Sequence, residues 1–242
     1  MRILIISDIH ANLTALEAVI ADAGEVDAAW CLGDLVGYGP DPNECIQRVR
    51  QLPNLLCLIG NHDAAVLGQI EIDSFNPEAR QAVVWTQQNL ASANADYLRN
   101  LPERALLNSV TLVHGSPRQP VWEYLLDTRT ATQNFAHFET PFCFVGHSHL
   151  PVIYQLNAGR RSADLIIPET GHQIAMAPRA IFNPGSVGQP RDRDPRASYA
   201  IFEPEEHIWD YRRVPYDVTS VQDRMQAHDL PARHIHRLSG GW

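Results

Sequence analysis

The first sixty or so residues alternate short, continuous apolar runs with segments of helical periodicity, and this alternation limits the folds open to the chain. Residues 3–7 form a branched apolar run, which is typical of a strand buried on both faces. Similar runs follow at residues 28–32 and 55–59, with helical patterns between them at residues 13–20 and 41–52. A strand-helix-strand order joins parallel strands through right-handed crossovers. The sequence therefore predicts an α/β fold that begins with parallel strands.

The pattern changes after Gly146, where short β-type segments follow one another without helical crossovers. Such segments are expected to pair antiparallel. Strands are also predicted at residues 106–113 and 142–145, and a last helix at 218–228. We predict a single domain over residues 1–242, a four-layer α-β-β-α sandwich of two packed mixed sheets with helices outside. The β-type segments after Gly146 lie at residues 152–156, 165–167, 180–182, 199–202 and 208–214.

Five of the predicted strands end in loops that carry carboxylate, amide or imidazole side chains. Each of these side chains alone is more often a helix cap, a turn residue or a structural histidine. Together they are more informative, because loops at the carboxyl ends of parallel strands meet in one crevice. The side chains belong to Asp8, His10, Asp34, Asn61, His62, Asp63, His114, His147 and His149.

This set of side chains predicts a metal centre. Carboxylate, amide oxygen and imidazole are ligands for Mn, Fe, Zn or Co, and so many imidazoles argue against calcium or magnesium. None of the four cysteines lies in these loops, which excludes a structural zinc site of the cysteine type. Seven ligands exceed what one catalytic ion with an open position needs. We therefore expect two divalent transition-metal ions that share one carboxylate, with manganese favoured.

The charge balance restricts the partners of such a site. A net charge of −9 argues against a broad face for a phosphate backbone, so no nucleic-acid duplex is expected as a partner. Two divalent ions bring four positive charges, and Asp8, Asp34 and a bridging hydroxide cancel three of them. The centre thus stays cationic and can hold a phosphate ester. We expect a small phosphorylated substrate.

Membrane and export signals are not apparent in the sequence. No segment approaches the roughly 20 apolar residues of a membrane span. The N-terminal apolar run is too short for a signal peptide. We therefore expect a cytoplasmic protein without a membrane partner. The oligomeric state is left open, with a homo-oligomer allowed.

The order of the motifs resembles that of the calcineurin-like metallophosphoesterase superfamily. The similarity is greatest to its small bacterial and archaeal phosphodiesterase branch. Residues 183–188 also resemble the N-P-G-S signature of that branch, so the motifs together cover about three quarters of the chain. The other matching motifs are D-x-H at residues 8–10, G-D at 33–34, G-N-H-D at 60–63, H-G at 114–115 and G-H-S-H at 146–149.

The resemblance implies a role for each motif residue. His62 would act from the side as a general acid or leaving-group stabiliser, oriented by Asp63, and Asp34 would bridge the two ions. Ala11 departs from the glycine or serine of many members, which affects the loop conformation. The remaining ligands would divide into Asp8, His10 and His149 for one ion and Asn61, His114 and His147 for the other.

Two further residues are candidates for substrate binding. Arg118 could grip a second phosphate with its guanidinium fork, and Tyr38 could stack on a base. A solvated arginine and a packed or turn tyrosine stay open as alternatives. Arg191 and Arg193 invite the same question as Arg118. The His-Ile-His at residues 234–236 repeats a ligand spacing without a preceding strand, so we expect its histidines to be exposed to solvent.

The function predicted from these motifs is hydrolysis of a small phosphodiester or nucleotide-type substrate, by two-metal activation of a bridging hydroxide. One alternative is a serine/threonine protein phosphatase, but the loop at residues 63–67 lacks the arginine-bearing stretch of those enzymes. The other alternative is a non-catalytic protein-interaction scaffold on the same fold. The presence of His62 beside a full ligand set argues against a scaffold.

Overall fold

The computed structural model describes residues 1–107, 109–157 and 159–242, which form two β-sheets and the helices around them. The strands of the first sheet are β1 (Ile3–Ile6), β2 (Ala28–Cys31), β3 (Leu56–Cys57), β9 (Gln173–Ala175), β11 (Ala197–Glu203) and β12 (Ile208–Val214). Those of the second sheet are β4 (Arg104–Leu107), β5 (Val110–Val113), β6 (Phe142–Phe144), β7 (Pro151–Asn157), β8 (Ser162–Ile166) and β10 (Ala180–Pro184). The α-helices are α1 (Leu13–Ala23), α2 (Pro42–Val49), α3 (Asn61–Val66), α4 (Pro77–Asn89), α5 (Ser92–Arg99), α6 (Thr128–Asn134), α7 (Val218–Ala227) and α8 (Ala232–Gly240). Two 3₁₀ turns are η1 (Ile72–Ser74) and η2 (Phe135–His137).

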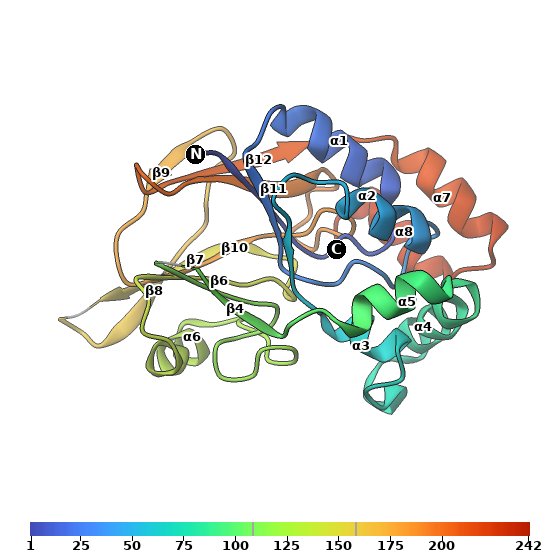
Figure 1. Ribbon diagram of the computed structural model, residues 1–242, viewed down its shortest axis with the longest axis horizontal. Coiled ribbons are helices and arrows are strands. Elements are labelled where there is room, and N and C mark those ends of the chain that lie inside the picture. The colour runs from blue at the N-terminus through green and yellow to red at the C-terminus, as the bar shows by residue number, and fades with distance from the viewer. Residues whose placement is uncertain (108, 158) are drawn as a thin grey trace.

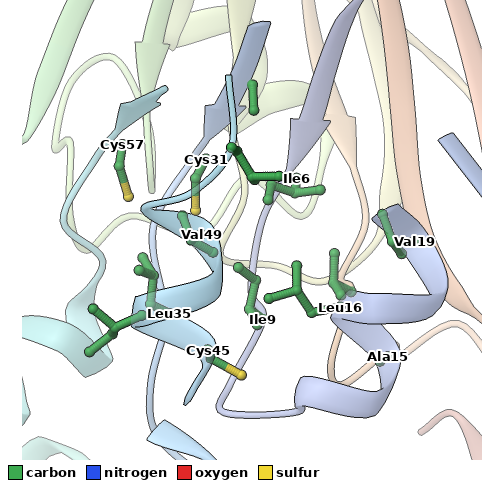
Figure 2. Close-up of a cluster of buried hydrophobic side chains, with 14 of the residues drawn as sticks. Ile6, Ile9, Ala15, Leu16, Val19, Cys31, Leu35, Cys45, Val49 and Cys57 are labelled. Carbon is green, nitrogen blue, oxygen red and sulfur yellow. The ribbon is translucent and has the colours of Figure 1, made fainter. Parts of the chain in front are cut away.

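The four side chains of β1 show how the layers are held together. Leu4 and Ile6 pack against the apolar faces of α1 and α2, as Figure 2 shows for Ile6. Ile3 and Ile5 point the other way, into the core between the two sheets, where Trp209 is also fully buried. Burying each such side chain contributes about 1.5–3 kcal/mol. On the far side, α6 packs on the outer face of the second sheet (Figure 1). The predicted four-layer α/β arrangement with two mixed sheets is confirmed.

Because several strands in each sheet are parallel, the loops that follow them lie at the same edge of that sheet. The first sheet has the order β3-β2-β1-β11-β12-β9, in which β1, β2 and β3 are parallel. The second has the order β4-β5-β6-β10-β7-β8, in which β5, β6 and β10 are parallel. The ends of β1, β2, β5 and β6 are therefore free to carry neighbouring loops.

The strands after Gly146 pair antiparallel with one another. The pairs β7–β8, β10–β7, β11–β12 and β12–β9 run antiparallel, as predicted. On its other side, β10 is parallel to β6, with Ala180 opposite Phe142. Because β6 precedes Gly146, this pair lies outside the prediction, and β10 joins the antiparallel strands to the parallel part of the second sheet.

The strand predicted over residues 106–113 is instead a pair of strands. Asn108 lies outside the described residues. On either side of it, β4 and β5 pair antiparallel, with Leu107 opposite Val110. The chain therefore reverses between β4 and β5, which the prediction overlooked.

The C-terminal segment contains a helix that the sequence did not indicate. The predicted helix α7 is present, but α8 follows it and packs against it through Ile235 and Leu238. His234 lies four residues before Leu238, so it shares the buried face and is only 1% exposed. The prediction of an exposed His234 is therefore wrong, whereas His236 is exposed as expected.

No helix in the described part of the chain is both long and apolar enough to cross a membrane.

Candidate active site

The loops at the strand ends bring six buried side chains into two triads. Within each triad, one potential ligand atom from every residue lies within 4.8 Å of the others. Asn61 joins the second triad, because its Oδ1 lies 3.1 Å from Nε2 of His114. All seven residues that the sequence singled out as metal ligands are thus gathered in one place. The triads are Asp8, His10 and His149, and Asp34, His114 and His147.

Backbone strain is concentrated in these loops. Five of the seven candidate ligands have φ between +49° and +63°, a region that non-glycine residues rarely adopt. Ala11, where the sequence departs from the expected motif, has φ of +52° and pays the same cost. Strain of this kind persists only where the surrounding structure enforces it. The five strained ligands are Asp8, His10, Asp34, His147 and His149.

Two glycines make room for site residues. A Cβ on Gly60 would collide with the side chain and backbone of Asp34. A Cβ on Gly37, which has φ of +89°, would lie 2.6 Å from Nδ1 of His62. Only glycine therefore allows the loops after β2 and β3 to pack this closely.

The first triad has too few protons for its own contacts. Nδ1 of His10 lies 3.1 Å from the carbonyl oxygen of Val36, and Nδ1 of His149 lies 2.6 Å from that of Gln189. The two Nε2 atoms lie 3.1 Å apart. Three hydrogen bonds need three protons, but two neutral imidazoles carry only two. With both Nδ1–H groups donating to carbonyls, two lone pairs face each other beside Asp8, and a cation between them would resolve the conflict.

Asp34 lies between the two triads. Its Oδ2 is 3.6 Å from Nε2 of His10 and 3.4 Å from Nε2 of His114. That oxygen is buried and accepts no hydrogen bond from the described residues, whereas Oδ1 accepts one from the backbone N–H of His62 at 2.8 Å. A buried carboxylate oxygen with free lone pairs between two sets of ligands fits an atom shared by two cations.

Backbone carbonyls orient the second triad as well. Nδ1 of His114 lies 2.8 Å from the carbonyl oxygen of Leu32, which leaves Nε2 toward Asp34. Nε2 of His147 lies 3.2 Å from the carbonyl oxygen of Trp122, which leaves Nδ1 as its ligand atom. Such outer contacts fix the tautomer of a ligating histidine.

Burial governs the charges of the site. It lowers the pKa of His10, His147 and His149 well below the usual range, so these rings are neutral, as metal binding requires. Burial raises the pKa of Asp8 to about 7. Burial also disfavours the charged forms of Asp34 and His114, but their mutual attraction outweighs it. The pKa of Asp34 is consequently held well below its usual range, and that of His114 rises to about 9.

His62 lies beside the triads and not within either. Burial lowers the pKa of its imidazole to about 4. The ring packs 4.3 Å from the ring of Tyr38 and 5.0 Å from that of Phe75, measured between centroids. Its Nδ1 is buried without a hydrogen-bond partner in the described chain.

The carboxylate of Asp63 was predicted to orient the ring of His62, but its hydrogen bonds go to backbone N–H groups. Its Oδ2 accepts hydrogen bonds from the backbone N–H groups of Asp34 and Gly60, both at 2.9 Å, and its Oδ1 accepts from that of Val36 at 3.1 Å. The carboxylate thus ties the loop after β2 to the start of α3. It positions the ligand-bearing backbone, and the ring of His62 is held by aromatic packing.

A cavity of about 240 Å³ opens beside His62, and its walls are largely aromatic. The rings of Phe75 and Trp122 meet edge to face at 6.0 Å, and Tyr124 stacks on His147 at 3.7 Å. Trp122 is 38% exposed and Tyr124 is 45% exposed, so both can receive a ligand. These residues come from segments between the motifs and were not indicated as site residues. The lining comprises Tyr38, Asn61, His62, Phe75, Asn76, Ala79, Trp122, Tyr124 and His147.

The two residues predicted to bind substrate have different surroundings. Tyr38 lines the cavity but is only 6% exposed, and its ring packs 4.6 Å from that of His10. Arg118 instead forms a charge-assisted pair with Glu123 and a hydrogen bond to Gln133 at 3.0 Å. Its guanidinium therefore already has a carboxylate partner.

The end of β10 and the residues that follow it hold the ligand loops in place. Asn183 donates to the carbonyl oxygen of Gly146 at 2.7 Å and to Oγ of Ser148 at 3.0 Å, which holds the loop between His147 and His149. Ser186 donates to the carbonyl oxygen of Asp8 at 2.8 Å. The N-P-G-S motif marked this stretch in the sequence, but only the structure shows that it braces both ligand loops.

Comparison with known proteins agrees with this geometry. The chain is 48% identical to a metallophosphoesterase of Sphaerobacter thermophilus, with a TM-score of 0.92 over 100% of this chain and 99% of that one. It is 37% identical to an uncharacterised protein of Methanocaldococcus jannaschii, over 95% of this chain and 93% of the relative. A shorter match, 35% identical over 71 residues, joins 28% of the chain to 25% of the symmetrical bis(5'-nucleosyl)-tetraphosphatase of Pectobacterium carotovorum. Residues 1–207 match the model of the calcineurin-like phosphoesterase superfamily domain, and the chain belongs to that superfamily.

Proposed function

We propose that this protein hydrolyses small phosphodiester or nucleotide-type substrates with the help of two divalent metal ions. The observation that carries the proposal is the pair of triads, with Asp34 within 3.6 Å of a histidine from each, beside a cavity lined by His62. The superfamily supports a hydrolase. We also propose that residues 1–242 act as one domain. The ring of His234, on the C-terminal helix α8, packs against that of Tyr38 near the N-terminal loops of the site.

The residues present fit divalent cations. The facing Nε2 atoms of His10 and His149 and the free Oδ2 of Asp34 are lone pairs directed at shared space. When bound, two such ions lower the pKa of water and neutralise phosphoryl charge. Neutral imidazole ligands suit Mn, Fe, Zn or Co, of which we favour manganese.

His62 is the residue that we assign to the leaving group. Its ring lines the cavity, while its backbone N–H holds Asp34 in place. A substrate phosphorus held near the triads would put its leaving oxygen within reach of this imidazole. We propose that His62 donates a hydrogen bond or a proton to that oxygen.

The cavity favours a small substrate with an aromatic group. A space of about 240 Å³ admits a ring system and its linker but not a folded protein segment. Phe75, Trp122 and Tyr124 offer faces and edges on which a nucleobase can stack. The local similarity to a bis(5'-nucleosyl)-tetraphosphatase supports the same substrate class.

The experiment is a hydrolysis assay with the purified full chain. Bis-p-nitrophenyl phosphate, nucleotides, dinucleoside polyphosphates and phosphopeptides are tested with Mn²⁺ and after chelation. We expect Mn²⁺-dependent hydrolysis of a diester or nucleotide that is lost in Asp34→Ala. Activity confined to phosphopeptides would support a protein phosphatase and contradict the proposed substrate. No activity with any metal or substrate would contradict the hydrolase and favour the scaffold.

A further inference from the structure

Two arginines meet beside the first triad without a carboxylate between them. Nη2 of Arg191 lies 3.1 Å from Oε1 of Gln189, and Nη1 of Arg237 lies 3.3 Å from the same oxygen. Neither guanidinium forms an ion pair within the described ranges of the chain. By contrast, Arg118 has Glu123 as its partner. One neutral amide oxygen thus serves two positive charges.

Within the residues that the structure describes, the two charges are compensated only by aromatic rings, with Arg191 over the ring of Tyr38 at 5.9 Å and Arg237 over that of Trp242 at 5.8 Å. Both arginines are half-buried, and the Nε atom of each is buried with no hydrogen-bond partner among the described residues. Burial and the charge of Arg191 both lower the pKa of Arg237. Partly buried charges are normally paired, and two like charges that share one acceptor repel each other. An anion bound between the two guanidiniums would remove the repulsion.

The pair lies one side chain away from the reacting centre. Arg191 donates from Nη2 to the hydroxyl of Tyr38 at 3.4 Å, and the ring of Tyr38 packs against those of His10 and His62. Gln189, which joins the two arginines, accepts from His149 through its backbone carbonyl. An anion held by the pair would therefore neighbour a phosphate held at the triads.

We propose that Arg191 and Arg237 form a subsite for a second phosphate of the substrate. This inference rests on the proposed function and narrows its substrate class to molecules with two or more linked phosphates. A planar guanidinium binds phosphate oxygens bidentately, and two of them more than neutralise the single negative charge of one internal phosphate group. Arg237 comes from α8, beyond the residues that match the superfamily model, so the subsite combines a motif loop with the C-terminal helix.

The first test compares substrates. In Arg191→Gln and Arg237→Gln, we expect kcat/KM for a dinucleoside polyphosphate to fall roughly tenfold more than that for bis-p-nitrophenyl phosphate, mostly through KM. Arg233→Gln is the matched control, because it removes an exposed charge from the same helix. Equal losses on both substrates, or the same selective loss in the control, would overturn the subsite for substrate phosphate.

The second test does not require hydrolysis. Metal-free full-length protein is titrated calorimetrically with tripolyphosphate and with orthophosphate. We expect tripolyphosphate to bind roughly tenfold tighter than orthophosphate, and each glutamine variant to lose most of that preference. Arg191→Lys keeps the positive charge without the guanidinium fork, so it should retain part of the preference for tripolyphosphate. Melting temperatures check that the variants fold. Equal binding of the two anions would overturn the proposal, even if hydrolysis were established; conversely, the preference could be observed in a protein that hydrolyses nothing.

Discussion

The two candidate metal triads and the aromatic wall beside them are built in opposite ways. Each triad residue is almost fully buried, backbone carbonyls orient the four histidine rings, and five of the six residues have strained backbones. The wall of Trp122 and Tyr124 is more than a third exposed and rests on ring packing. A site that holds reacting atoms needs fixed geometry, whereas a surface that selects the rest of the substrate tolerates change. Substitutions in the triads should therefore abolish the reaction, and substitutions in the wall should alter substrate preference.

The largest effect is expected for Asp34→Ala. Its carboxylate lies within 3.6 Å of a histidine from each triad, so its loss affects both candidate ion sites. We expect activity to fall by more than roughly 10⁴-fold, beyond the loss of a single proton-transfer group. His10→Ala removes a ligand from one triad and should retain more metal, as elemental analysis of both variants can show. Equal metal content in the two variants would contradict the bridging role.

A large but selective effect is expected for His62→Ala. The ring lies beside the triads, so the variant should keep its metals while turnover falls roughly 10²–10⁴-fold. The loss should shrink for substrates with good leaving groups, which need little protonation. His62→Gln keeps a donor and serves as the matched control. Loss of metal in His62→Ala would contradict the role that we assign to this residue.

A moderate effect is expected for the aromatic wall. Trp122→Ala and Tyr124→Ala should each raise KM for a nucleoside phosphodiester roughly tenfold, because a stacked base is worth about 1–3 kcal/mol. The KM for a diester without an aromatic ring, such as glycerophosphocholine, should change little. Trp85→Ala, on α4, is a matched control because this side chain packs against α7 and α8. A rise in KM that is equal for both substrates would show that the wall does not bind the base.

The smallest effect is expected for Arg118→Ala. The sequence made Arg118 a candidate for gripping a second phosphate, in which case KM should rise more for substrates with several phosphates than for a simple diester. Because Glu123 already pairs with this guanidinium, we expect only a few-fold change, well below that of Arg191→Gln. Steady-state kinetics of both variants on one dinucleoside polyphosphate decide the order. A larger effect of Arg118→Ala would restore the original prediction.

The sequence predicted the triads better than the wall, for a physical reason. Parallel strands bring their carboxyl ends together whatever the connecting segments do, so Asp8 and Asp34 could be placed from apolar periodicity alone. Phe75 and Arg237 reach the site only through the packing of η1 and α8 on other elements, which no local pattern encodes. His234 shows the same limit, since its burial depends on α8 docking against α7.

The most direct test of the two-ion centre is the metal content of the protein. The chain is stripped of metal, reconstituted with Mn²⁺ and measured by elemental analysis at saturation. Because seven buried ligand-type side chains form two sets around Asp34, we predict close to two ions per chain. A saturating stoichiometry of one ion per chain would contradict the dinuclear centre, and with it the proposed assignment of Asp34 as the shared ligand.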